Sequence, residues 1–292
     1  MMKKGINQWA FSHDLSLRKI FETAHNAGFD GIELNLEKSN YTQKAINTEQ
    51  EITSITMDSE RDDLEKIVEL AQQYQLELPS VSTALLWDTS LTANESDERE
   101  MAKKIVRKMI DVANILGADT VLVVPGAVDI PWKPNFNPVP YEQAYHRSFE
   151  ALKELKHYAE ENEIIIAIEN VWNKFLLSPL EMRDFVDALE SKFVGIYFDV
   201  GNVLLTGYPE DWIGILGARI KRIHLKDFRK MMSGQGSMVN LLEGDVNWNN
   251  VIAALRKIDF ESYLTAELFP YKFHNERLIY DTASAIEAIL TV

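Results

Sequence analysis

Four residues of metal-ligating type end four successive β-like runs in the second half of the chain. They are Glu169, Asp199, His224 and Glu267, in the runs IAIE, IYFD, RIH and LTAE. Alternate residues of a strand share a face, so one inward-facing alternation would bring all four together. Three adjacent carboxylates repel one another unless a cation compensates, and a carboxylate–imidazole set suits Mn2+, Mg2+, Co2+ or Zn2+. The pattern therefore predicts a site for one divalent metal ion.

Each of these residues also has a simpler interpretation when it is taken alone. The two glutamates could be buried partners of Arg222 or Lys226, and the aspartate, which precedes Val-Gly-Asn, fits an Asx turn. Arg222 shares strict alternation with the histidine, so either it points inward as an ion-pair partner or a bulge breaks the alternation. The recurrence of all four at equivalent strand ends favours the metal site over these separate interpretations.

The elements that must position these residues alternate regularly. Eight β-rich runs are expected at Lys4–Trp9, Gly31–Leu36, Leu76–Thr83, Thr120–Pro125, Ile164–Glu169, Val194–Asp199, Ile220–Leu225 and Tyr263–Leu268. Helical patterns lie between them, at Ser16–Ala27, Asp62–Tyr74, Ser96–Leu116, Tyr141–Glu161, Pro179–Ser191, Pro209–Leu216, Trp248–Ile258 and Glu276–Leu290.

Eight strand–helix units in 292 residues predict an α/β fold, a (β/α)8 TIM barrel that forms a single domain over residues 1–292. The alternative is an open doubly wound sheet, which would have a glycine-rich nucleotide turn after an early strand. The segment Ala-Phe-Ser-His-Asp after the first run has no glycine. Long irregular stretches at Ile130–Pro140 and Met231–Asn247 follow the fourth and seventh runs, which places both at the catalytic mouth of a barrel.

Composition narrows the classes of partner. The formal net charge of −15 argues against nucleic acid, because nucleic-acid binding needs a dense basic surface. The chain has no cysteine, which excludes disulfides and thiolate ligands and is compatible with a cytoplasmic location. The amino end lacks the apolar stretch of a signal peptide, and no run of about 18 apolar residues predicts a membrane span. A small-molecule ligand is therefore expected.

A set of ordered motifs resembles a known family. The motifs are Gly-Phe-Asp-Gly-Ile-Glu33-Leu, Ile-Glu169-Asn170, Phe-Asp199-Val-Gly-Asn202, His224-Leu-Lys226-Asp227 and Glu267. Together they resemble the xylose isomerase-like TIM barrels, in particular the sugar phosphate isomerase/epimerase group, over essentially the whole chain.

The resemblance implies a metal-dependent isomerase or epimerase of a small sugar or sugar phosphate. Counterparts of Glu169, Asp199, His224 and Glu267 hold one divalent ion in this family, commonly Mn2+, which chelates the carbonyl and an adjacent hydroxyl oxygen of the substrate. The ion stabilises a cis-enediolate, and two glutamates act as base and acid, here Glu169 and Glu267. Family members are commonly dimers or tetramers, so a homodimer or homotetramer is expected.

Further residues are candidates for substrate contact. Lys226 would share the inward face of the histidine and reach a substrate oxygen or phosphate, although a rim salt bridge with Asp227 or Glu33 is the alternative. Asn170 and Asn202 adjoin predicted ligands and offer amide donors and acceptors, although Asn202 also suits a turn.

Aromatic and basic residues near the expected mouth extend this set. Trp9, Trp132 and Trp172 follow strands one, four and five, where a ring could stack on a sugar or simply pack. Arg229 and the Ser-Gly-Gln-Gly-Ser segment at 233–237 follow strand seven, where they could bind phosphate or form a solvated loop.

Departures from the family pattern leave alternatives open. Free-ketose 3-epimerases have a histidine at the position of Asn202 and a glutamate at that of Phe175, which puts that activity in doubt. A dehydratase of inosose type, a lyase, shares the metal and the enolate chemistry. An endonuclease of the apurinic-site type would need extra histidine and acid ligands, of which few are visible. A non-catalytic sugar-binding barrel would not require both glutamates.

Overall fold

The computed structural model of the chain describes residues 1–39, 54–231 and 236–292. In this part of the chain, parallel strands close into a barrel in the order β1-β2-β4-β5-β6-β7-β8-β11, and β11 returns to β1. The bounds are β1 (Lys3–Asn7), β2 (Gly31–Glu37), β4 (Ser80–Ser82), β5 (Thr120–Val123), β6 (Ile165–Glu169), β7 (Val194–Asp199), β8 (Ile220–Leu225) and β11 (Tyr263–Ala266). The predicted (β/α)8 barrel is confirmed.

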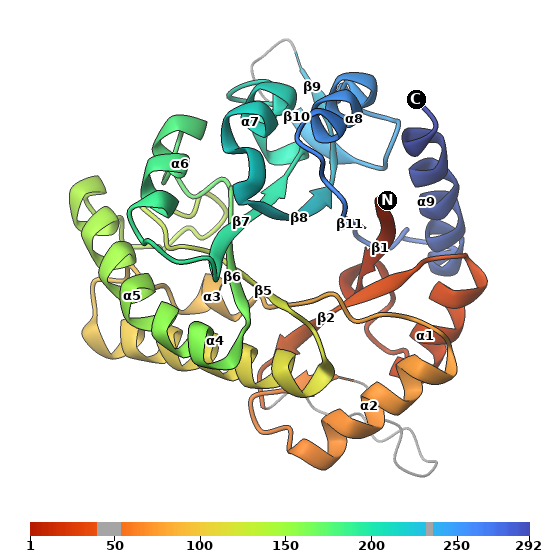
Figure 1. The fold of residues 1–292 in the computed structure, drawn as a ribbon, viewed down its shortest axis with the longest axis horizontal. Coiled ribbons are helices and arrows are strands. Elements are labelled where there is room, and N and C mark those ends of the chain that lie inside the picture. Colours follow the sequence, from red (N-terminus) through yellow and green to blue (C-terminus); the bar gives the residue numbers. More distant parts are fainter. Residues whose placement is uncertain (40–53, 232–235) are drawn as a thin grey trace.

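Helices surround the barrel in chain order, and Figure 1 shows them as an outer ring. They are α1 (Leu17–Asn26), α2 (Arg61–Gln73), α4 (Ser96–Leu116), α5 (Tyr141–Asn162), α6 (Pro179–Asp187), α7 (Pro209–Leu216), α8 (Trp248–Lys257) and α9 (Asn275–Leu290). Ser16 caps α1 through a hydrogen bond from the Lys19 amide, and Gly117 ends α4 with φ 73°. None of the described helices is long and apolar enough to cross a bilayer.

The sequence-based boundaries were wrong by two or more residues at four strands, among them the fourth predicted run, Thr120–Pro125, which ends at Val123. The first strand stops at Asn7, because the Asn7 side chain accepts a hydrogen bond from the Trp9 amide and starts the 3-10 helix η1 (Gln8–Ala10). The third is only β4, preceded by a single bridge from Glu77 to Gly31. The last ends one residue before Glu267. Short elements also occupy predicted loops: β3 (Ile55–Thr56), α3 (Leu85–Asp88), β9 (Asp227–Lys230) and β10 (Gly236–Val239).

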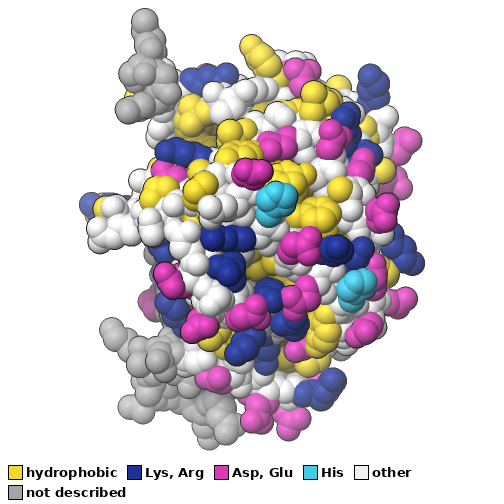
Figure 2. Space-filling model, turned by 90° about the vertical axis from the view of Figure 1, so that its left-hand side faces the viewer, with side chains coloured by type: hydrophobic (Ala, Val, Ile, Leu, Met, Phe, Trp, Pro, Cys, Tyr) yellow, Lys and Arg dark blue, Asp and Glu magenta, His cyan; other side chains and the backbone are white. Residues whose placement is uncertain are grey.

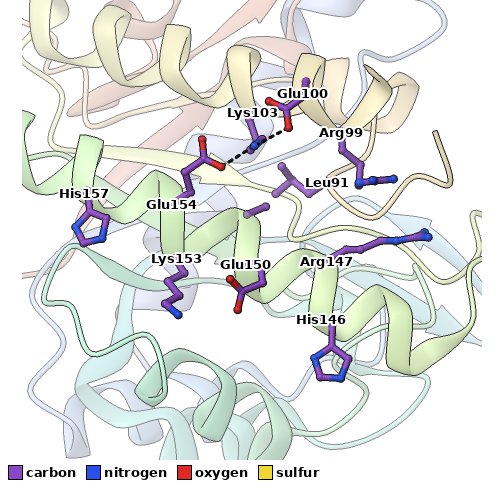
Figure 3. A pocket seen from close by; sticks show the side chains of 11 residues that line it. Leu91, Arg99, Glu100, Lys103, His146, Arg147, Glu150, Lys153, Glu154 and His157 are labelled. Atoms are coloured by element: carbon purple, nitrogen blue, oxygen red, sulfur yellow. Dashed lines mark hydrogen bonds and ion pairs between the residues drawn. The ribbon is translucent and has the colours of Figure 1, made fainter. Parts of the chain in front are cut away.

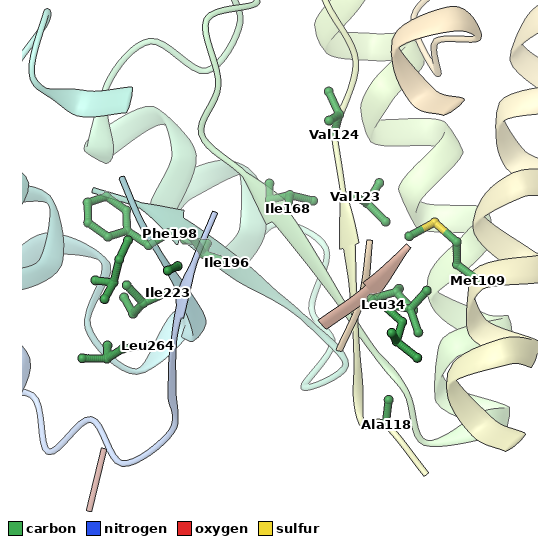
Figure 4. Packing of buried hydrophobic residues seen from close by; sticks show 14 of the residues in the cluster. Leu34, Met109, Ala118, Val123, Val124, Ile168, Ile196, Phe198, Ile223 and Leu264 are labelled. Atoms are coloured by element: carbon green, nitrogen blue, oxygen red, sulfur yellow. The ribbon is translucent and has the colours of Figure 1, made fainter. Parts of the chain in front are cut away.

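The two faces of each strand belong to different layers of packing. Outward residues such as Leu34, Ile168 and Phe198 are buried beneath the helices, and Met109 of α4 belongs to the same cluster (Figure 4). Their inward neighbours form a separate interior, in which Leu122, Ala167 and Tyr197 make a small apolar cluster. This alternation holds polar side chains inside the barrel while the larger apolar core lies outside it.

Arg222 lies inside the barrel at the end opposite to the predicted metal site. Its guanidinium pairs with the Asp119 carboxylate and donates a 2.6 Å hydrogen bond to Ser262 Oγ. Of the two possibilities for this residue, the inward ion-pair partner is therefore the one observed, although the β7–β8 register also shifts at Ile196/Tyr197. The two predicted ligand glutamates are not its partners.

Replacing Asp119 by alanine is expected to lower the free energy of unfolding by about 1–3 kcal/mol, because it leaves the guanidinium, which is 8% exposed, without its carboxylate. Urea unfolding followed by circular dichroism measures the change, and Asp119→Asn, which keeps one acceptor oxygen, should lose less. An unfolding midpoint equal to that of the wild type would show that the pair contributes nothing.

Candidate metal centre

The four predicted ligands meet at the carboxyl end of the barrel. Glu169 and Asp199 end β6 and β7, His224 is the penultimate residue of β8, and Glu267 directly follows β11. One ligand atom from each residue lies within 4.8 Å of the other three. They converge because parallel strands all end at the same edge of the barrel and their inward alternation is in phase. All four side chains are at least nearly buried, and Glu267 is the most exposed at 12%.

The atoms that face one another lack hydrogen-bond partners. Glu169 Oε1, Asp199 Oδ2, His224 Nδ1 and Glu267 Oε2 are all buried and without a hydrogen bond. Some approach closely, as do His224 Nδ1 and Glu267 Oε2 at 2.7 Å, but without the alignment that a hydrogen bond requires. Buried polar atoms are nearly always paired. Four unpaired atoms aimed at one point fit a group that binds all of them, as a divalent cation does.

The ammonium group of Lys226 lies among these carboxylates. Its Nζ is 2.9 Å from Asp199 Oδ2, 2.5 Å from Glu267 Oε2 and 4.0 Å from Glu169 Oε1. Counting Glu33 beneath the cluster, four carboxylates face two basic groups, Lys226 and His224. With all four carboxylates ionised, two negative charges remain in excess even when both basic groups are protonated, and a divalent ion would balance them. The alternative for Lys226, a rim salt bridge with Asp227 or Glu33, is not present among the described residues.

The surroundings separate the proton affinities of the two predicted catalytic glutamates. Burial raises the pKa of Glu169 to about 7. Burial would also raise the pKa of Glu267, but the charges of Lys226 and His224 outweigh it and hold that pKa at about 2. Of these two neighbouring carboxyl groups, Glu169 therefore retains a proton more readily and Glu267 favours the ionised form. This arrangement suits one acid and one base.

Asp199 is held by its neighbours on both sides. The Asn170 side chain accepts a 2.8 Å hydrogen bond from the Asp199 amide and donates one to the Asp199 carbonyl. The Asn202 amide donates to Asp199 Oδ1 at 2.8 Å, and Asn202 Nδ2 donates to the Asn170 carbonyl. Both asparagines were predicted either to contact substrate hydroxyls or to support a ligand, and these contacts show them orienting the aspartate.

Asp227 organises the loop that follows β8. Its carboxylate is fully buried and accepts hydrogen bonds from the amides of Phe228, Leu242 and Val246 and from Trp248 Nε1. From its sequence position, Asp227 was expected only as part of a motif and as a possible salt-bridge partner of Lys226. Its role is instead to tie residues 241–248 to the barrel beside the metal centre.

The remaining candidates are distributed around the mouth. Trp9 lies in η1 and is partly buried, whereas Trp132 is exposed and packs edge-on against Trp87. Trp172 donates a 2.9 Å hydrogen bond from Nε1 to the Asn202 carbonyl and packs edge-on against Phe228, so it has a structural role. Arg229 is exposed and bonds to the Glu243 carbonyl.

Two further positions from the sequence are the 233–237 segment, expected either to bind phosphate or to form a solvated loop, and Phe175, which replaces a glutamate of the free-ketose 3-epimerases. Residues 236 and 237 pair with Lys230 and Arg229 in the β9–β10 hairpin, and 232–235 lie outside the described residues. Phe175 is buried among aromatic rings, including Tyr141 and Phe185.

A polar layer inside the barrel, below the metal centre, was not recognised from the sequence. Glu33 of β2 accepts hydrogen bonds from Asn7, Ser80 and Tyr197 and lies beside His224. Burial would raise the pKa of Glu33, but the nearby His224 charge and these hydrogen bonds hold it below its ordinary value. The missed signal was alternation: Asn7, Glu33, Ser80 and Tyr197 all occupy inward positions of their strands.

A groove lies on the outside of the barrel, between α4 and α5, and its lining differs from the metal centre in carrying paired acidic and basic side chains. Figure 2 shows basic and acidic side chains interspersed over this face of the molecule. In the groove, Lys103 is engaged by Glu100 at 2.7 Å and Glu154 at 2.6 Å (Figure 3). Within the described residues, the acid–histidine cluster that could hold a metal is the one at the barrel mouth. The extra ligands that the endonuclease alternative requires are not found in that part of the chain.

Comparisons with known proteins agree with this geometry. The sequence model of the family described as "Xylose isomerase-like TIM barrel" matches residues 21–289. Over 272 residues, the chain is 23% identical to the Escherichia coli protein named "Putative L-ribulose-5-phosphate 3-epimerase SgbU", covering 92% of this chain and 89% of that protein. An inosose dehydratase of Bacillus thuringiensis is 26% identical over 164 residues, about half of each chain. A D-psicose 3-epimerase structure from Clostridium cellulolyticum superposes with a TM-score of 0.78 at 15% identity, covering 100% of this chain and 99% of that one, which shows the shared fold.

Proposed function

The chain belongs to the xylose isomerase-like TIM barrel family, and we propose that it is a divalent-metal-dependent isomerase or epimerase of a small sugar. The observation that carries the proposal is the set of four buried ligand atoms, from Glu169, Asp199, His224 and Glu267, that converge on one point without hydrogen bonds. Lys226 forms ion pairs with three of these carboxylates, but none of the four atoms has the hydrogen bond that a purely structural network would provide. A binding barrel would have no use for an acid on each side of the site.

Glu169, Asp199, His224 and Glu267 would hold one divalent ion, with Mn2+ as the proposed metal because carboxylate oxygens dominate the set. When bound, such an ion polarises the substrate carbonyl and acidifies the adjacent C–H group. Asn170 and Asn202 keep Asp199 in place through its backbone and Oδ1, so that Oδ2 remains directed at the cluster.

The proton transfers fall to the two glutamates. One carboxylate removes the proton from the carbon next to the carbonyl, and the other carboxyl group returns a proton to the opposite face or to the adjacent carbon. In the metal-free chain, burial raises the pKa of Glu169 to about 7, so this carboxyl group can carry a proton near neutral pH before an ion binds. Lys226, whose ammonium group lies among the carboxylates of the site, would donate hydrogen bonds to substrate oxygens.

The substrate class follows from the relatives and from the site. The name of the Escherichia coli relative points to a ketose phosphate, and a polyhydroxylated carbonyl compound matches the oxygen-rich ligand set. Arg229, the basic residue predicted for phosphate, is exposed and bonded to a backbone carbonyl. Free ketoses and their phosphates therefore belong together in the substrate screen.

Elemental mass spectrometry on untagged, dialysed protein loaded with Mn2+ is expected to find about one ion per chain. Incubation of that protein with ketoses and ketose phosphates in deuterium oxide should then place deuterium next to the carbonyl of the converted sugar. Protein that binds no Mn2+ would contradict the metal centre, and conversion without any deuterium uptake would point to hydride transfer instead of proton transfer.

A lyase is the second candidate, favoured by the partial match to inosose dehydratase. The same base would remove the same kind of proton, and a hydroxide group would then leave from the neighbouring carbon. The screen separates the two activities, because a dehydratase product is lighter than its substrate by one water molecule, whereas an isomer has the same mass.

A further inference from the structure

Glu33 lies fully buried in the barrel interior, directly beneath the metal centre. Its Oε1 is 2.8 Å from His224 Nε2, and the side chains of both residues have no solvent exposure. The other nitrogen of this ring, Nδ1, is the atom that faces Glu169 and Glu267. Glu33 therefore contacts His224 on the side of the ring turned away from the predicted ligands.

The carboxylate of Glu33 is fixed by three further donors. Asn7 Nδ2 donates to Oε1 at 2.6 Å, while Ser80 Oγ and Tyr197 OH donate to Oε2 at 2.6 and 2.7 Å. With His224 included, each oxygen has two neighbouring donors, which is the arrangement of an ionised carboxylate that acts only as an acceptor. These donors come from β1, β4 and β7, so Glu33 is clamped by strands around the barrel.

An ionised carboxylate at Nε2 determines which ring nitrogen carries the proton. Glu33 accepts a hydrogen bond only if Nε2 is protonated, and a neutral imidazole then has its lone pair on Nδ1. Nδ1 is the buried nitrogen that has no hydrogen-bond partner. The ring is also packed against Tyr197, with ring centroids 4.3 Å apart, which limits its rotation.

We propose that Glu33 is a positioning residue that holds His224 with Nε2 protonated and Nδ1 directed at the metal, and that strengthens Nδ1 as a ligand through its negative charge. The proposal rests on the metal centre proposed above. Carboxylates that bond to the distal nitrogen of a ligating histidine commonly raise metal affinity by 10–100-fold. Glu33 itself does not face the cluster, so it acts through the histidine.

Metal affinity tests the proposal with a matched pair of variants. Glu33→Gln keeps the shape and one acceptor oxygen but removes the charge, and it should weaken Mn2+ binding by roughly 10–100-fold in isothermal titration calorimetry. Ser80→Ala removes a hydrogen bond to the other oxygen of the same buried carboxylate, and it should change the affinity less than threefold at a comparable loss of thermal stability. Equal affinities for Glu33→Gln and the wild type would overturn the proposal, as would an equal loss in Ser80→Ala.

The protonation of His224 gives an independent readout in the wild-type chain. In protein labelled with 15N-histidine, the His224 signals are identified by their absence from His224→Gln. A proton is expected on Nε2 both in the metal-free protein and after loading with diamagnetic Zn2+, and Nδ1 should shift on loading. An unprotonated Nε2 in either form would overturn the proposal for Glu33. A wild-type chain that binds neither Mn2+ nor Zn2+, with Nε2 still protonated, would instead overturn the proposed metal centre.

Discussion

Replacement of Asp199 by alanine is expected to abolish metal binding and turnover together. Asp199 is fully buried, and its Oδ2 is one of the four unpaired atoms of the cluster. Its loss removes one ligand and one of the negative charges that hold the ion, and it leaves Lys226 paired chiefly with Glu267. Changes to residues that merely support a ligand cost 10–100-fold in metal affinity, so loss of a ligand should cost at least about 100-fold.

Binding of Mn2+ by calorimetry and turnover of the substrate found in the screen measure this effect on the same preparation. Asp199→Asn serves as a gentler variant, because its amide oxygen can still accept the hydrogen bond from the Asn202 amide. Asp119→Ala is the control for altered stability, since it lies at the opposite end of the barrel and should bind metal normally. Normal turnover in Asp199→Ala would exclude this residue from the site.

The barrel and its four predicted ligands were accessible from sequence because both depend on local pattern. Apolar alternation marks the strands, and the carboxyl ends of parallel strands share one edge, so acidic ends in successive units must approach one another. The error at the third strand has a different origin. Leu76, Glu77 and Leu78 alternate as in a strand, but Pro79 cannot donate a hydrogen bond to the ladder, and the paired strand is Ser80–Ser82.

Roles that depend on a partner far along the chain were harder to predict. Glu33 and His224 are 191 residues apart, and neither alone indicates the hydrogen bond between them. Asp227 has a lysine next to it in the sequence as a plausible partner, but its carboxylate accepts hydrogen bonds from backbone amides 15 and 19 residues further along the chain. Asn170 and Asn202 stand beside predicted ligands in the sequence. Whether their amide groups bond to substrate or to the backbone could be decided only from the observed hydrogen bonds to the Asp199 and Asn170 carbonyl oxygens.

Substituting glutamine for either Glu169 or Glu267 is expected to lower kcat by about 10²–10⁴-fold, the usual contribution of a general acid or base. The amide retains an oxygen that can ligate a metal, so Mn2+ affinity should fall far less than in Asp199→Ala. The glutamine amide cannot accept a proton from carbon, so its main effect is on kcat. Removal of a metal ligand lowers the affinity for Mn2+ first. The ratio of the two losses therefore distinguishes a proton-transfer group from a ligand alone.

Solvent exchange separates the two glutamates from each other. The variant that lacks the base for a given substrate should neither convert the sugar nor exchange its C–H proton with deuterium oxide. The other variant retains the base, so it should still exchange that proton while conversion is blocked. Because an epimerase runs in both directions, the two variants should exchange roles when the product is supplied as substrate. Conversion within tenfold of the wild-type rate in both variants would mean that the proton moves through other groups.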